Sequence, residues 1–212
     1  MHSLFHMDNP VINCLSKLLD CFVLSLCWIV ASLPILTIGA SCGALYRTVC
    51  RSIRRDEGYP LRMFWDTYRR NLKICILTWL SVCAVYILLF ADMFILERLM
   101  SQGYSMVYLF IILGVLIGVT TAWAAYCTAY CVSFEGNLKQ ILGQSLVLTL
   151  LHPIMTILIL ALLVIGVVLI LFVPVLVLLL PALICVVISF PMEKVFLKHM
   201  RPEDVDKVQN GQ

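Results

Sequence analysis

Ten cysteines and four histidines are the side chains of this chain best suited to metal binding or redox chemistry. No CxxC pair occurs. Cys127 and Cys131 are four residues apart and share a helix face, with His152 as a conceivable third ligand. Eight cysteines fall inside apolar runs, where cysteine packs as a small hydrophobic side chain; they are Cys21, Cys27, Cys42, Cys75, Cys83, Cys127, Cys131 and Cys185. Packing is therefore the favoured interpretation, and we expect no metal and no cofactor.

Acidic residues inside apolar runs are the other candidates for chemistry. Asp92 lies near the end of such a run, where a carboxylate is costly unless it is paired, faces water or lies at the interface. Because Glu97 and Arg98 follow about one turn later, an interfacial position is expected, with a functional role as the alternative. The sequence has no GxxxxGK[ST], GxSxG, HExxH or paired-carboxylate arrangement. The chain is therefore not expected to be an enzyme.

The composition places the chain among membrane proteins. Hydrophobic residues make up 62% of its 212 residues and charged residues 13%, with a net charge of +3. The mean hydropathy is +1.02. We predict an all-α integral membrane protein, a single domain formed by a bundle of about five transmembrane helices. The predicted spans are 19–45, 74–96, 104–134, 154–171 and 175–192, with the last turn near Pro174 or, alternatively, Pro181.

The first predicted span is longer than one straight crossing of about 20 residues requires. Pro34 is expected to kink or break it, because proline removes a backbone hydrogen bond. Beyond Pro34, Gly39 and Gly43 form a GxxxG motif, which permits close helix packing. A polar site built on the break between Pro34 and Ser41 is the alternative. A second GxxxG motif at Gly114 could pack on the first or support a homo-oligomer.

Eight of the fifteen basic residues lie in one loop, residues 47–73. Lys and Arg concentrated beside apolar spans mark the cytoplasmic side. This rule explains the basic loop, so we expect no nucleic-acid partner. From Pro60, the periodicity predicts an amphipathic helix at the membrane surface, with aromatic residues on one face and cations on the other. Its candidate contacts with anionic lipid, or alternatively with a cytoplasmic partner, are Arg51, Arg54, Arg55, Arg62, Trp65, Arg69 and Arg70.

Counting charges on each side predicts the orientation. Five spans place thirteen basic residues, including those of the tail 193–212, on the cytoplasmic side, and leave Lys17 and Arg98 outside. The N-terminus is then expected outside and the C-terminus in the cytoplasm. Near the N-terminus, Asp8 or Asn9 is expected to cap a short surface helix that begins at Pro10.

Several groups of residues resemble the YesL family of small bacterial membrane proteins. In the first span and before it they are Leu4-Phe5, Asp8-Asn9-Pro10, Leu15-Ser16-Lys17-Leu18, Asp20, Ser32-Leu33-Pro34-Ile35, Thr37-Ile38-Gly39-Ala40-Ser41 and Ala44-Leu45-Tyr46. After it they are Arg55-Asp56-Glu57-Gly58-Tyr59, Phe64-Trp65, Asn71-Leu72-Lys73 and Asp92. The resemblance is specific over residues 4–96 and only hydropathic in the last third of the chain.

The resemblance implies an accessory membrane protein of carbohydrate uptake in a bacterial plasma membrane, working beside the subunits of an ABC importer. The leading hypothesis is a non-enzymatic scaffold. The alternative is a small solute transporter or channel that uses the break after Pro34 together with Asp92. The residues singled out as a structural or binding set are Asp8, Asn9, Pro10, Pro34, Gly39, Ser41, Gly43, Tyr46, Asn71 and Asp92.

Overall fold

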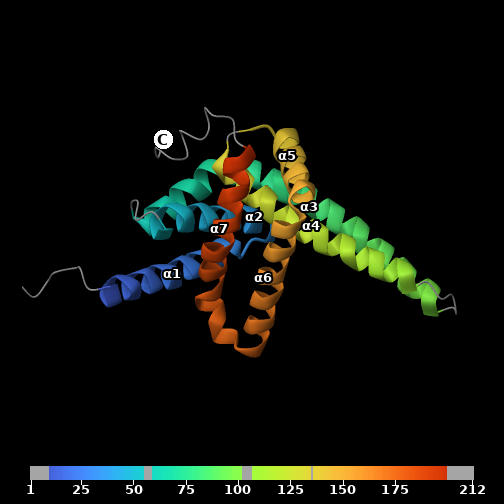
Figure 1. Ribbon diagram of the computed structural model, residues 1–212, viewed down its shortest axis with the longest axis horizontal. Helices are drawn as coiled ribbons and strands as arrows, with labels where there is room; N and C mark the ends of the chain where they lie inside the picture. The colour runs from blue at the N-terminus through green and yellow to red at the C-terminus, as the bar shows by residue number, and fades with distance from the viewer. Residues whose placement is uncertain (1–9, 55–58, 102–106, 135, 200–212) are drawn as a thin grey trace, which may run out of the picture.

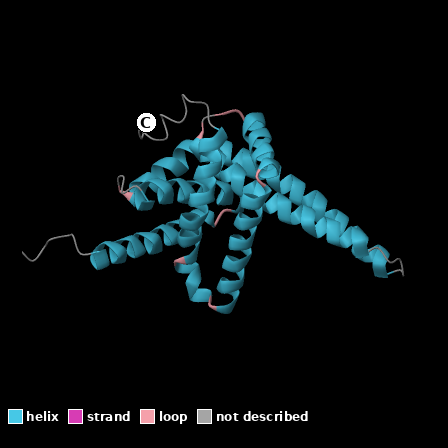
Figure 2. Cartoon of the chain, in the orientation of Figure 1, coloured by secondary structure: helices cyan, strands magenta, loops and turns pink. Residues whose placement is uncertain are grey.

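The computed structural model describes residues 10–54, 59–101, 107–134 and 136–199, and every regular element within them is helical (Figure 2). The predicted all-α fold is confirmed. The seven α-helices are α1 (Pro10–Ser32), α2 (Ile38–Thr48), α3 (Pro60–Ser101), α4 (Val107–Ser133), α5 (Leu138–Leu151), α6 (Pro153–Phe172) and α7 (Leu180–His199). Helices α1, α3, α4 and α6 are long and apolar enough to cross a membrane, and α5 and α7 contain shorter apolar segments. The chain is an integral, multi-pass membrane protein.

The first apolar run is two antiparallel helices, which corrects the single span predicted over residues 19–45. Helix α1 ends at Ser32, and the short 3₁₀ turn η1 (Ile35–Thr37) leads into α2. Side chains then pair in antiparallel order: Ser32 with Ser41, and Trp28 with Cys42. In Figure 1, α2 accordingly runs back along α1. Pro34 therefore reverses the chain, rather than merely bending it.

Helix α3 joins the predicted amphipathic helix to the predicted second span. It is continuous over 42 residues, or about 63 Å at about 1.5 Å per residue. A helix does begin at Pro60 as expected, but no helix end separates Lys73 from Ile74. Helix α4 packs beside α3 in the opposite direction, and Tyr86 donates a hydrogen bond of 2.9 Å to Thr121. This pair forms the longest hairpin of the molecule (Figure 1).

Helices α5, α6 and α7 form the third apolar unit. At the start of α5, the backbone N–H of Asn137 donates to Gln140 Oε1 at 3.2 Å, as in a capping box. His152 and Pro153 separate α5 from α6. The chain then reverses through η3 (Pro174–Leu178), so the reversal begins where the sequence placed it rather than at Pro181, which lies inside α7.

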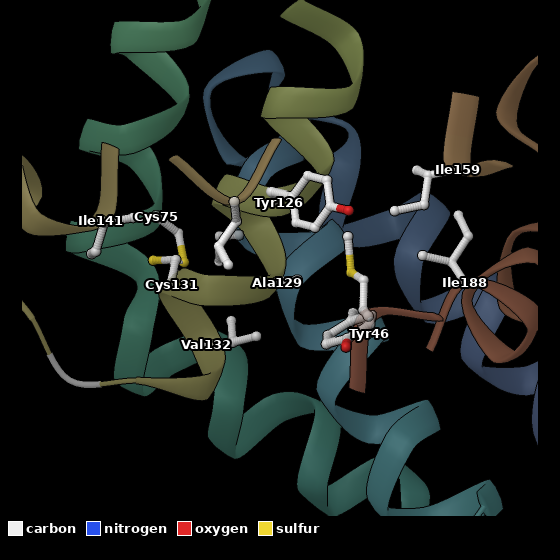
Figure 3. Packing of buried hydrophobic residues seen from close by; sticks show 12 residues of the cluster. Tyr46, Cys75, Tyr126, Ala129, Cys131, Val132, Ile141, Ile159 and Ile188 are labelled. Atoms are coloured by element: carbon white, nitrogen blue, oxygen red, sulfur yellow. The ribbon is translucent and has the colours of Figure 1, made fainter. Parts of the chain in front are cut away.

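Three arms leave a common centre in Figure 1: α1, the α3–α4 hairpin and the α6–α7 hairpin. We call this centre the hub. It contains α2, the π-helical turn η2 (Val49–Ile53) and the parts of the other helices that pack around them. Its buried side chains include Leu24, Leu45 and Phe64 in one cluster, and Tyr126 and Ile188 in a second cluster (Figure 3). The arms instead carry exposed Leu, Ile, Val and Phe side chains, as expected for surfaces that face lipid.

Candidate functional site

The tip of the α1–α2 hairpin satisfies its own polar groups. Ser32 and Ser41 hydroxyls lie 2.6 Å apart, and Ser41 also donates to the carbonyl of Ile38 at 2.9 Å. Thr37 Oγ1 lies 2.8 Å from the carbonyl oxygens of Ala31 and Pro34. Proline and the reversal would otherwise leave these backbone groups unpaired in an apolar setting. The hydroxyls at the break therefore serve the reversal, which is a structural role.

The tip is held against α3 by Trp79. Its indole Nε1 donates to the carbonyl of Ile35 at 3.1 Å. A Cβ atom added to Gly39 would lie 2.8 Å from Trp79 Cβ, so only glycine allows this approach. Gly43 similarly faces Val132 of α4, where an added Cβ would lie 2.6 Å from a methyl group. The first GxxxG motif thus packs α2 into the crevice between α3 and α4.

A small cavity lies beside this contact. Its volume is about 10 Å³, close to the smallest that holds one water molecule. Its walls are apolar or weakly polar and include none of the ionised residues; they are Gly39, Cys75, Thr78, Trp79, Val82, Ala124, Cys127, Thr128 and Cys131. Neither Pro34 nor Asp92 lines it. A cavity of this size does not accommodate a sugar or a hydrated ion.

Asp92 lies away from the helix break. It is exposed on α3, thirteen residues beyond Trp79, which corresponds to about 20 Å of helix. The two features that the transporter alternative combines are therefore not brought together. In the second GxxxG motif, a Cβ atom added to Gly114 would meet nothing within 4 Å, and Gly118 faces Leu160 of α6 instead of the first motif.

Arg54, one of the arginines predicted to contact lipid or a partner, is engaged inside the protein, and so is Arg47 of the same loop. Arg54 donates to Ser189 Oγ at 3.1 Å, and its guanidinium lies 4.1 Å from the centre of the Phe190 ring. Arg47 donates to the carbonyl of Val132, and Arg51 is half-buried in η2. These contacts connect η2 to α7 and α2 to α4. Arg47 and Arg54 therefore stabilise the hub. Arg55 lies outside the described residues.

The first third of α3 divides its aromatic residues between two faces, which differs from the amphipathic pattern predicted. Phe64 is buried and stacks with Tyr68 at 6.3 Å between ring centres, so this face packs on the hub. Leu61 and Trp65 remain 45% and 37% exposed. They share the outer face with exposed charged residues: Arg62, Asp66, Arg69, Arg70 and Lys73. We call these seven residues the outer face of α3.

The remaining predicted site residues are structural or fall outside the description. Tyr46 is buried in the hub, and Asn71 donates to the carbonyl of Thr67 at 3.3 Å on the same helix. Pro10 is the first residue of α1, so the surface helix expected there is part of α1. Asp8 and Asn9 lie outside the described residues. In the part of the chain that is described, no three His, Cys, Asp or Glu side chains could hold a metal ion together.

Two contacts could not be predicted from the sequence. Ser189 on α7 receives Arg54 from 135 residues earlier in the chain, and the thiols of Cys75 and Cys131 meet across 56 residues. Such pairs depend on which helices are neighbours, and hydropathy does not report this. The four-residue spacing of Cys127 and Cys131 did place two thiols on one face, and both line the cavity.

Comparison with known proteins adds one finding. Residues 21–93 match the family model DUF624, described as a protein of unknown function. This stretch falls within residues 4–96, where the sequence resembles the YesL family. No curated protein and no solved structure matches the chain.

Proposed function

We propose that this chain is a non-enzymatic accessory or scaffold protein of the membrane and a member of the DUF624 family, of YesL type. The observation that carries the proposal is the contrast between a tightly packed hub and an exposed cationic surface. The cavity beside Gly39 in the hub has a volume of only about 10 Å³, whereas the outer face of α3 presents four cations and one carboxylate. This contrast favours binding to a neighbouring protein over transport of a solute through the chain.

We further propose that both termini lie in the cytoplasm, in place of the outside N-terminus expected from five spans. Helices α1 and α2 are antiparallel, as are α3 and α4 and also α6 and α7, so each pair returns the chain to the side from which it started. Of the twelve basic residues in the described segments, Arg98 alone lies next to the end at which its helix pair reverses, in the last turn of α3. The other eleven lie toward the opposite ends of these pairs, away from the reversals: Lys17, Arg47, Arg51, Arg54, Arg62, Arg69, Arg70, Lys73, Lys139, Lys194 and Lys198. This asymmetry is steeper than the one counted for five spans, which supports the orientation.

The outer face of α3 is the surface that we propose for a cytoplasmic partner. Arg62 precedes the first apolar residue of the span, Ile74, by twelve residues, or about 18 Å along the helix. A headgroup layer is only about 7 Å deep, given a bilayer of about 45 Å around a core of about 30 Å. Arg62 and Trp65 therefore extend beyond the lipid unless α3 is strongly tilted. A protein segment that carries carboxylates and an apolar residue complements this face better than lipid alone does.

The resemblance to YesL proteins points to subunits of a carbohydrate ABC importer as the partner. A second copy of the chain is a further candidate, through the open surface at Gly114, because Gly39 and Gly43 are already occupied within the chain. We set the transporter alternative aside, since Asp92 lies about 20 Å along α3 from Trp79, which contacts the helix break, and neither Pro34 nor Asp92 lines the cavity of about 10 Å³.

Cross-linking in native membranes tests the proposal. The wild-type chain should yield covalent adducts with an importer subunit, identified by mass spectrometry after purification in mild detergent. The triple variant Arg62→Glu, Arg69→Glu, Arg70→Glu should reduce the adducts at least tenfold, whereas Arg98→Glu, at the opposite end of α3, should leave them unchanged. Recovery of the cross-linked wild type without any importer subunit would contradict the proposed partner.

A further inference from the structure

Two buried cysteine thiols meet where α3 packs against α4. Cys75 Sγ and Cys131 Sγ lie 2.9 Å apart, and both residues are 3% or less exposed. Figure 3 shows the two sulfur atoms pointing toward each other from adjacent helices. Both thiols are free. A disulfide bond of about 2.05 Å is within reach of small rotations of these side chains.

The surroundings of this pair favour reaction between the two thiols. The cavity of about 10 Å³ reaches both of them, and a third thiol, Cys127, lines it one turn away from Cys131. The cavity gives the sulfur atoms room to move while the helices stay in place. Cys75 follows Lys73, the last charged residue before the span, by two positions. The pair therefore lies near the polar end of the arm, where a small oxidant enters the protein more readily than at mid-membrane.

We propose that Cys75 and Cys131 form a redox-modification site, at which a membrane-permeant two-electron oxidant of the quinone or azo class converts two thiols into a disulfide. One thiol loses its proton, and its sulfur adds to the oxidant. The second thiolate attacks that sulfur, forms the S–S bond and releases the reduced oxidant. Two S–H bonds break and one S–S bond forms, while two electrons and two protons pass to the oxidant. A dithiol reductant reverses the change by thiol–disulfide exchange.

The bond would tie α3 to α4 at the hub end of the hairpin. Gly43 of α2 lies against the same place, since an added Cβ there would be 3.9 Å from Cys75 Sγ. Oxidation would thus fix α3 and α4 relative to each other where they pack on either side of α2. It would restrict any hinging of the long arm at its root.

Oxidation of the full chain in detergent micelles or vesicles tests this site, with diamide, an azo compound, as the oxidant. After treatment, denaturation and alkylation, the wild type should carry two fewer alkyl groups than the ten of the reduced chain. Peptide mapping should then recover a Cys75–Cys131 cross-link that disappears with dithiothreitol. Cys127→Ser is the matched control from the same cavity and should retain the cross-link, whereas Cys75→Ser and Cys131→Ser should abolish it.

The wild-type map decides the outcome even if a serine variant does not fold. Alkylation of all ten cysteines after diamide treatment would overturn the proposal. A diamide-induced disulfide that joins other cysteines, or one that persists in Cys131→Ser, would overturn it as well.

Discussion

The two GxxxG motifs of this chain have the same sequence pattern and different surroundings. Gly39 and Gly43 lie where α2 meets α3 and α4, and neither has room for a methyl group without movement of its neighbours. Gly114 lies on the outer part of the α3–α4 arm with open space above it, and Gly118 only touches Leu160. The motif therefore permits close packing but does not specify it. The location of a glycine relative to the hub decides whether the residue matters for stability.

The same contrast holds for the hub and the arms as a whole. In the hub, helices from different parts of the sequence meet, and large side chains such as Leu24 and Tyr126 are fully buried. In the arms, each helix has essentially one antiparallel neighbour and turns its other sides outward. Lipid rather than water surrounds the arms, so shortening an exposed leucine there should change the free energy of unfolding little. We expect mutations to separate these two regions clearly.

The first comparison is between two leucines, one in the hub and one on an arm. Leu24→Ala removes a side chain that is 0% exposed in the hub and should lower the free energy of unfolding by about 2 kcal/mol, the lower end of the usual range because lipid reduces the transfer contribution. Leu88→Ala changes a side chain that is 67% exposed on the arm and should have an effect below about 0.5 kcal/mol. Equilibrium unfolding in detergent micelles measures both. Equal losses would contradict the division between hub and arm.

The two GxxxG motifs provide the next comparison. Gly39→Ala places a methyl group against Trp79 Cβ, which is close to the backbone and cannot move independently, so a loss of about 1–3 kcal/mol is expected. Gly114→Ala meets no neighbour and should be neutral or should stabilise α4 by up to about 1 kcal/mol. Melting temperatures in the same detergent provide the measurement. A stabilising Gly39→Ala would show that α2 does not pack against α3 as described.

The smallest effects concern hydroxyl hydrogen bonds. Ser41→Ala leaves the half-buried Ser32 hydroxyl without its 2.6 Å partner at the chain reversal and should cost up to about 1.7 kcal/mol. Thr121→Val removes the partner of Tyr86 within the arm and should cost about 0.6 kcal/mol, the average for such bonds in membranes. Equilibrium unfolding in the same detergent shows which of the two variants loses more free energy of unfolding. A larger loss for Thr121→Val would place the more important polar contact in the arm.

Much of this architecture could be predicted from the sequence, because it depends on local patterns. Long uncharged runs predict helices; Pro34 follows the end of one helix, and Pro60 and Pro153 each begin another. The reversal after Pro34 could not be predicted, since a hydropathy profile gives the length of an apolar run but not the direction of the chain within it. That one reversal changes the expected side of the N-terminus.

The candidate site was less predictable than the fold. The sequence identifies the cations of the basic loop, but it cannot show that Arg54 turns inward to Ser189 while Arg62 and Arg69 remain on the surface. Nor can periodicity alone separate Phe64, which is buried, from Trp65, its neighbour on the outer face. The first distinction depends on the packing of α7 against η2, and the second on the packing of η2 against α3.

The side of the membrane that holds the N-terminus tests the reversal at Pro34 most directly. The eleventh strand of split green fluorescent protein can be fused before Met1, inserted after Gln102 or fused after Gln212, with the complementary ten strands expressed in the cytoplasm. Our account predicts fluorescence for the tags at both termini and none for the tag after Gln102. A dark N-terminal tag on a stably inserted protein with a bright C-terminal tag would show that the first apolar run crosses the membrane once, and it would contradict the proposed topology.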